Sequence, residues 1–131
     1  MKTRVPSIII IEDNPGDIEL MRLAFSEFDY DINFRIFDDG QEALDFLQSK
    51  AFGETLYDLI VMDINLPGLS GFDILEQLKH EAFEVPMIIF SSLKSSEYEK
   101  KALHPLIKEY LVKPTSTQEY FRIVQSFNRY W

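Results

Sequence analysis

Along the 131-residue chain, apolar runs of strand length alternate with segments that have a helical period. The strand-length runs are Val5 to Ile11, Ile32 to Phe37, Leu59 to Met62, Pro86 to Phe90 and Tyr110 to Val112. The helical segments are Asp17 to Phe28, Gly40 to Leu47, Phe72 to Leu78, Ser95 to Leu103 and Thr117 to Trp131. Five strands and five helices in strict alternation predict an α/β protein with a doubly wound parallel sheet. The third and fifth runs are almost wholly apolar, which predicts that helices cover both faces of this sheet.

Length and composition fit one folded domain. A chain of 131 residues can bury about two-thirds of the surface that its unfolded form exposes. Hydrophobic residues make up 46% of the chain and aromatic residues 14%, which is enough for a packed core. No repeat, low-complexity tract or linker interrupts the alternation. We therefore expect a single domain over residues 1–131, without an output domain.

Charge and cysteine content exclude several classes of protein. The formal net charge of -9 argues against nucleic-acid binding, which needs clustered Lys and Arg, and favours divalent cations or basic protein surfaces as partners. The absence of cysteine excludes disulfides, thiol catalysis and cysteine-bound zinc. The apolar run near the N-terminus is too short for a signal sequence or a membrane span. We expect a soluble, cytoplasmic protein that binds no membrane.

Polar side chains stand where the apolar runs end. They are Glu12, Asp13 and Asn14 after the first run, Asp63 and Asn65 after the third, Ser91 and Ser92 after the fourth, and Lys113 and Pro114 after the fifth. In a flavodoxin-like sheet of order 2-1-3-4-5, strands 1 and 3 are neighbours, and ligands bind beyond the carboxyl ends of the strands. We therefore expect these side chains at one edge of the sheet, with Asp63 aimed into a crevice rather than buried.

The charges of these side chains suggest a chemistry. Glu12, Asp13 and Asp63 would repel one another unless a cation neutralised them, and hard carboxylate oxygens suit Mg²⁺. Lys113 would then meet an anion brought to the metal, and phosphoryl is the group that Mg²⁺, a lysine and a hydroxyl bind together. A carboxylate that touches both metal and phosphoryl can act as a nucleophile and form an acyl phosphate.

Four stretches, "EDN", "VMDINLPGLSGFDIL", "PMIIFSS" and "YLVKP", stand in the order and spacing of a response-regulator receiver domain. The chain resembles this family from Val5 to the last helix. The resemblance implies a phosphoacceptor switch in a two-component signalling system, in which a histidine kinase phosphohistidine transfers its phosphoryl group to Asp63. It is a phosphoacceptor protein that assists its own phosphorylation and dephosphorylation rather than an enzyme.

The same resemblance implies a role for each residue of the site. Asp13 ligates Mg²⁺ directly, Glu12 holds it through water, and the backbone carbonyl of Asn65 completes the protein's ligands together with Asp63. Ser91 and Lys113 contact phosphoryl oxygens, and Tyr110 corresponds to the family's switch aromatic. Glu12 stands where many members have Asp, and Ser91 replaces the more frequent Thr. A cis peptide bond between Lys113 and Pro114 is one way in which the Lys113 side chain could be aimed at the site.

Each of these residues also has a purely structural interpretation, and other protein classes share the fold. Asp63 alone could be turn chemistry, Lys113 alone a solvated lysine, and Tyr110 a core aromatic. A phosphatase with an Asp nucleophile would need a second acid where Asn65 stands, and an FMN carrier would not place Glu12 and Asp13 in its phosphate loop. A receiver that takes no phosphate and serves only as an interaction module is the remaining alternative.

The expected partners follow from the resemblance. "IEDNPGDIEL" and "FNRYW" are most similar to stand-alone receivers that partner bacterial phytochromes, so a phytochrome histidine kinase is the expected donor. The downstream protein is unknown. One stripe of the segment Thr117 to Trp131 should face the sheet, which leaves Phe121 and Tyr130 at its margins. Aromatics near a surface favour a homodimer through this C-terminal helix, while the alternative is that they fold back over their own core.

Overall fold

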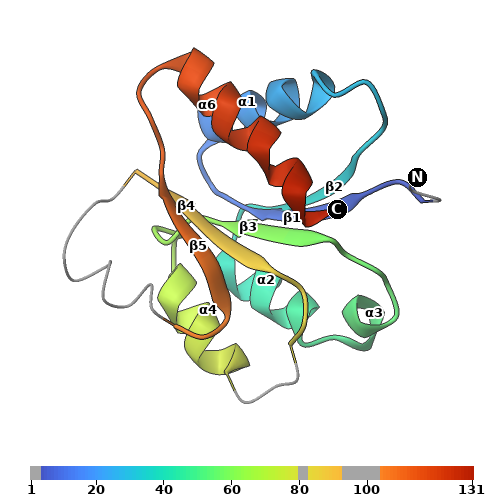
Figure 1. Cartoon of the computed structure of the whole chain (residues 1–131). Helices are drawn as coiled ribbons and strands as arrows, with labels where there is room; N and C mark the ends of the chain where they lie inside the picture. Colours follow the sequence, from blue (N-terminus) through green and yellow to red (C-terminus); the bar gives the residue numbers. More distant parts are fainter. Residues whose placement is uncertain (1–3, 80–82, 93–103) are drawn as a thin grey trace.

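The computed structural model describes residues 4–79, 83–92 and 104–131, and its central element is a five-stranded parallel sheet (Figure 1). The strands are β1 (Ser7–Ile11), β2 (Asn33–Phe37), β3 (Leu59–Met62), β4 (Met87–Ser91) and β5 (Ile107–Val112). Their order is β2-β1-β3-β4-β5, so the predicted sheet is confirmed and β1 and β3 are neighbours at its centre.

The helices lie on both faces of the sheet. They are α1 (Pro15–Ser26), α2 (Gly40–Leu47), α3 (Lys50–Gly53), α4 (Gly71–Leu78), α6 (Thr117–Gln125) and the 3₁₀ helix η1 (Ser126–Tyr130). In Figure 1, α1 and α6 cover one face, and α2, α3 and α4 cover the other. None of the described helices is long and apolar enough to cross a membrane. The helix expected over 95–103 lies outside the described residues.

The core consists of two apolar layers separated by the sheet. Ile9 and Ile11 of β1 face the layer that contains the buried residues of α2 and α4, while Ile8 and Ile10 face the layer of α1 and α6. This division follows from the alternation of side chains along a strand. All four isoleucines are fully buried, as are the strand residues of β3 and β4, so these strands are held on both faces.

The fifth strand differs from its prediction in length and burial. It begins at Ile107, three residues before the predicted start, and its residues are half-buried or exposed, including Lys108 and Val112. β5 is the last strand in the sheet order, so only β4 pairs with it. An apolar run at the edge of a sheet therefore does not become a fully buried strand.

The C-terminal segment folds back on its own domain. α6 ends at Gln125, and the 3₁₀ helix η1 replaces the continuous helix predicted to Trp131. The Trp131 indole Nε1 donates to the Tyr30 hydroxyl at 2.8 Å, and its ring meets the Phe28 ring edge-on at 5.8 Å. The Tyr130 hydroxyl donates to the Glu109 carboxylate on β5. These aromatics thus have partners within the chain.

Two glycines let helices approach the loop that follows β3. A methyl group at Gly40, the first residue of α2, would lie 2.1 Å from the carbonyl oxygen of Leu69 in this loop. A methyl group at Gly71, the first residue of α4, would lie 2.9 Å from the carbonyl oxygen of Asp63. Both contacts are too short for a side chain, so the small residues fix how closely α2 and α4 pack on the loop.

We expect Gly40→Ala to destabilise the fold by about 1–3 kcal/mol, because a backbone carbonyl must move to admit the methyl group. The matched control is Gly53→Ala in α3, where a methyl group meets nothing within 4 Å. That control should leave stability unchanged or raise it by up to about 1 kcal/mol, since Ala favours helix over Gly. Urea unfolding of both variants measures the difference. Equal midpoints for the two variants would show that the close approach at Gly40 does not constrain the loop.

Candidate functional site

Backbone hydrogen bonds of the sheet hold the first polar residue after each central strand. The Glu12 N–H donates to the Phe37 carbonyl at 2.9 Å, and the Asp63 N–H donates to the Ile11 carbonyl at 2.9 Å. On the other side, the Lys113 N–H donates to the Ser91 carbonyl at 2.8 Å. The sheet therefore continues one residue past three strands, and it carries Glu12, Asp63 and Lys113 to the same edge.

The Lys113 ammonium lies at the centre of the site. Its Nζ is 3.0 Å from Asp63 Oδ2 and 3.1 Å from Asp17 Oδ2, and it also contacts Glu12 Oε1. Only 6% of the lysine side chain is exposed. Burial lowers the pKa of Lys113, but hydrogen bonds and charge from Glu12 and Asp63 outweigh burial and raise the pKa above its ordinary value. Lys113 is therefore a site cation, not a solvated surface lysine.

The Glu12 carboxylate is fully buried. Its Oε1 accepts from Lys113, while its Oε2 accepts from the N–H groups of Asp13 at 3.1 Å and Asn14 at 3.2 Å. Burial raises the pKa of Glu12 to about 7, against the opposing effect of Lys113. The Glu12 side chain, one methylene longer than Asp, thus binds the backbone of the two residues that follow it as well as Lys113.

Asp63 is buried, with 7% of the residue exposed, so the expectation that it is aimed into a crevice rather than buried is wrong as to burial. Its Oδ1 accepts from the Asn65 N–H at 3.1 Å, and its Oδ2 accepts from Lys113. Burial alone would raise the pKa of Asp63. The charge of Lys113, the Asn65 N–H and the Ser91 hydroxyl together hold that pKa below its ordinary value. Asp63 is therefore ionised at neutral pH.

Three carboxylates of the site could hold a metal ion. Glu12, Asp13 and Asp63 each offer one oxygen, and these oxygens lie within 4.8 Å of one another. Asp13 is exposed whereas the other two are buried, so an ion could enter past Asp13. Lys113 balances one negative charge, and with its pKa of about 7 Glu12 is only partly ionised at neutral pH, so a net negative charge remains on the cluster. The hard oxygen donors and the residual charge fit Mg²⁺, which keeps part of its water shell.

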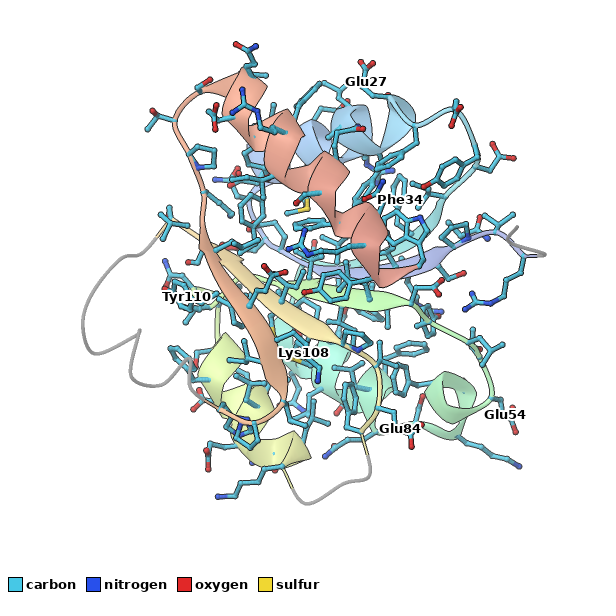
Figure 2. All side chains as sticks on the ribbon, viewed as in Figure 1. Glu27, Phe34, Glu54, Glu84, Lys108 and Tyr110 are labelled. Carbon is cyan, nitrogen blue, oxygen red and sulfur yellow. The ribbon has the colours of Figure 1, made fainter. Side chains whose placement is uncertain are left out.

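The remaining predicted residues lie at or near this cluster. Ser91 is fully buried at the end of β4, and its hydroxyl bonds the Asp63 carboxylate. Tyr110 is half-buried on β5 and pairs with Ile89 of β4 (Figure 2). Because side chains alternate along strands, Tyr110 lies on the same face of the sheet as Ile89 and Ser91. The Asn65 side chain is exposed, and only its backbone takes part in the cluster.

Two features of the site differ from the sequence-based expectations. The described part of the chain has no cis peptide bond, so the cis bond raised for Pro114 is wrong, and Lys113 reaches the site from a trans bond. Asp17, in the first turn of α1, was not predicted as a site residue although its carboxylate contacts Lys113. Its position in the sequence predicts only a helix start, because the contact depends on how α1 packs relative to β5.

Comparison with known proteins identifies the family of the chain. Residues 8–125 match the family model described as the response regulator receiver domain. Response regulator ArlR of Staphylococcus aureus is 30% identical over 123 residues, which cover 93% of this chain and 52% of ArlR. The probable methanogenesis regulatory protein FilR2 of Methanothrix harundinacea is 27% identical over 127 residues, covering 95% of this chain and 82% of FilR2. The chain thus spans about half the length of some curated relatives.

Solved structures share the fold. The phosphorylated cyanobacterial phytochrome response regulator RcpA superposes with a TM-score of 0.84 at 23% identity, covering 98% of this chain and 94% of RcpA. The Mn²⁺-bound form of response regulator Rcp1 gives a TM-score of 0.82 at 23% identity, covering 96% of this chain and 94% of Rcp1. At this identity the likeness concerns the fold. Because residues 8–125 of its 131 residues match the family model, the chain belongs to the response regulator receiver domain family.

Proposed function

We propose that this receiver domain takes a phosphoryl group onto Asp63 from the phosphohistidine of a sensor histidine kinase, in a reaction that needs Mg²⁺. The observation that carries the proposal is the Asp63 carboxylate itself. It is ionised and nearly buried, it contacts the Lys113 ammonium at 3.0 Å, and its oxygen lies within 4.8 Å of oxygens of Glu12 and Asp13. A receiver domain is a phosphoacceptor regulatory domain, and we propose no separate catalytic activity for it.

In the proposed reaction an oxygen of Asp63 forms a bond to phosphorus while the bond from phosphorus to the kinase imidazole breaks. The imidazole nitrogen keeps the electron pair, and one proton, already on the other ring nitrogen or taken from water, leaves the kinase histidine as a neutral imidazole. Glu12, Asp13, Asp63 and the backbone carbonyl of Asn65 are the proposed ligands of Mg²⁺. When bound, the ion offsets the negative charge of the phosphoryl oxygens.

The other site residues bind the phosphoryl group during and after transfer. Lys113 would donate a charge-assisted hydrogen bond to one phosphoryl oxygen. The Ser91 hydroxyl would turn from the Asp63 carboxylate to a second phosphoryl oxygen. We propose that this movement of Ser91 frees space for Tyr110 on the same face of the sheet, so that the surface around β5 changes. An unknown downstream protein would read this surface.

The experiment that tests the proposal is incubation with acetyl phosphate, with and without Mg²⁺, followed by intact mass measurement and peptide mapping. We expect one phosphoryl group per chain, only with Mg²⁺, and on the peptide that contains Asp63. Beryllofluoride, a phosphoryl mimic, should perturb NMR signals near Asp63 and reach Tyr110. A chain that gains no phosphoryl group would favour the alternative, an interaction module of the same fold.

We propose a phytochrome as the kinase. The support is the similarity of "IEDNPGDIEL" and "FNRYW" to phytochrome-partner receivers, together with the shared fold of RcpA, whose structure is described as a phytochrome response regulator. Transfer from a purified phytochrome kinase to the wild-type chain, compared with transfer from an unrelated kinase, tests this. Equal rates from both kinases would remove the preference.

We also propose a homodimer through the C-terminal segment, strengthened by phosphorylation. Phe121 on α6 and Tyr130 at the end of η1 are half-buried, which leaves part of each residue accessible to a second copy. The contact of Tyr130 with Glu109 on β5 joins this segment to the strand of Tyr110. Sedimentation with and without beryllofluoride and Mg²⁺, on the full chain and on a chain without Tyr130 and Trp131, measures the association. A monomer throughout at high concentration would contradict the dimer.

A further inference from the structure

We propose that Asp17 is a positioning residue that competes with the incoming phosphoryl group for the Lys113 ammonium and thereby slows phosphorylation. The inference rests on the proposed function of Asp63. It concerns a residue of α1 that is neither a proposed metal ligand nor a proposed phosphoryl ligand, yet it contacts the site lysine as closely as Asp63 does.

The Asp17 to Lys113 contact is not an ordinary surface ion pair. Asp17 Oδ2 lies 3.1 Å from Lys113 Nζ, with 22% of the Asp17 side chain and 6% of the Lys113 side chain exposed. Exposed ion pairs are weakened by water and salt, whereas a largely enclosed pair is screened much less. The pair therefore constrains where the ammonium lies.

The backbone of Asp17 is fixed from two sides. Its N–H donates to the side-chain oxygen of Asn14, the N-cap of α1, at 3.0 Å. Its carbonyl accepts from the hydroxyl of Tyr120 on α6 at 3.3 Å. Tyr120 is only 2% exposed, and its ring lies 5.1 Å from that of Phe90 in the core. The backbone that carries the Asp17 carboxylate is thus held in place by hydrogen bonds to both of its polar groups.

The donor count of lysine makes Asp17 a competitor. An ammonium has three N–H donors, and Lys113 contacts three carboxylates, those of Glu12, Asp63 and Asp17. Lys113 Nζ donates hydrogen bonds to Glu12 and Asp63, and Asp17 attracts the remaining N–H from 3.1 Å. A phosphoryl oxygen must compete with Asp17 for that donor. Glu12 and Asp63 belong to the proposed metal and phosphoryl centre, so Asp17 is the partner that is displaced.

The charge of Asp17 acts in the same direction. Glu12, Asp63 and Asp17 contact a single lysine, and Asp13 lies beside Glu12 and Asp63. Each additional negative charge opposes the approach of an anionic phosphoryl donor. Replacing Asp17 by Asn removes one charge and leaves Lys113 with a weaker competitor. Both effects favour faster transfer to Asp63.

The test compares Asp17→Asn with Glu19→Gln at saturating Mg²⁺, with acetyl phosphate as the donor. Glu19 is exposed on α1 two residues away, so its substitution makes the same change in net charge outside the site. We expect the phosphorylation rate constant to rise about three- to tenfold in Asp17→Asn and to stay near wild type in Glu19→Gln. The conservative Asp17→Glu should return the rate toward wild type.

A second measurement separates positioning from a change in folding. The NMR signals of the Lys113 ε-methylene should move in Asp17→Asn without Mg²⁺ or donor and should stay in place in Glu19→Gln. If wild type is phosphorylated but Asp17→Asn reacts no faster, or if the Lys113 signals do not move, the inference is wrong. If wild type itself takes no phosphoryl group, the proposed function fails instead, and the two failures are distinct.

Discussion

Asp63→Asn will abolish Mg²⁺-dependent phosphorylation while the protein stays folded. The amide has the shape of the carboxylate and can keep the hydrogen bond from the Asn65 N–H, but it is not a nucleophile toward phosphorus. It also replaces one of the three carboxylates of the proposed metal cluster by a neutral amide, so Mg²⁺ affinity should fall. Intact mass after incubation with acetyl phosphate measures the first effect, and calorimetric titration measures the second.

Asp58→Asn is the matched control for this variant. Asp58 is also an aspartate with little exposure, 8%, but its carboxylate binds the Arg4 guanidinium and the Ser7 N–H instead of Lys113. The control should lower thermal stability slightly and leave phosphorylation unchanged. Phosphoryl incorporation that persists in Asp63→Asn, on any residue, would show that Asp63 is not the acceptor.

Lys113→Ala will slow phosphorylation by roughly a hundredfold, the usual effect of losing one donor to a developing oxyanion. It will also destabilise the metal-free protein, because Glu12 and Asp63 lose the cation that they share in a buried site. The cost should lie below the usual ~3 kcal/mol for breaking such a pair. The raised pKa of Glu12, about 7, lets this carboxyl take up a proton near neutral pH instead of remaining a buried anion.

Mg²⁺ should restore much of the stability lost in Lys113→Ala, since an ion that binds only the folded protein stabilises it. Lys108→Ala is the matched control, because Lys108 is an exposed lysine on the same strand (Figure 2). Urea unfolding with and without Mg²⁺ should separate the two variants, and Lys108→Ala should follow wild type in both conditions. If Lys113→Ala is phosphorylated at the wild-type rate, the lysine has no role in transfer.

The central sheet could be predicted because the residues of its inner strands meet a single requirement, burial on both faces of the sheet. The four isoleucines of β1 and the run Leu59–Met62 are apolar on both faces, and only a strand between two helical layers buries both. The shared edge of Glu12, Asp63 and Lys113 then follows from parallel topology alone. These inferences needed no knowledge of how any helix was oriented.

Features that depend on packing between elements could not be predicted in the same way. The contact of Asp17 with Lys113 joins residues 96 positions apart and depends on how α1 packs against the sheet beside β5. The short α3 and the change from α6 to η1 depend on local capping and on Phe127 entering the core. Apolar periodicity does not report either effect.

The two edge strands of the sheet bear on how copies of this protein can meet. An open edge can pair with a strand of another molecule, which leads to aggregation unless charge or irregularity prevents it. On β2 the exposed Arg35 lies over the Phe37 and Phe46 rings, at 5.2 and 4.2 Å. On β5 Lys108 is exposed, and the pairing with β4 has an irregularity at Met87 and Ile88. Both edges thus resist continuation of the sheet into a neighbour, which fits the proposed homodimer, because its contact would lie on the C-terminal helical segment instead.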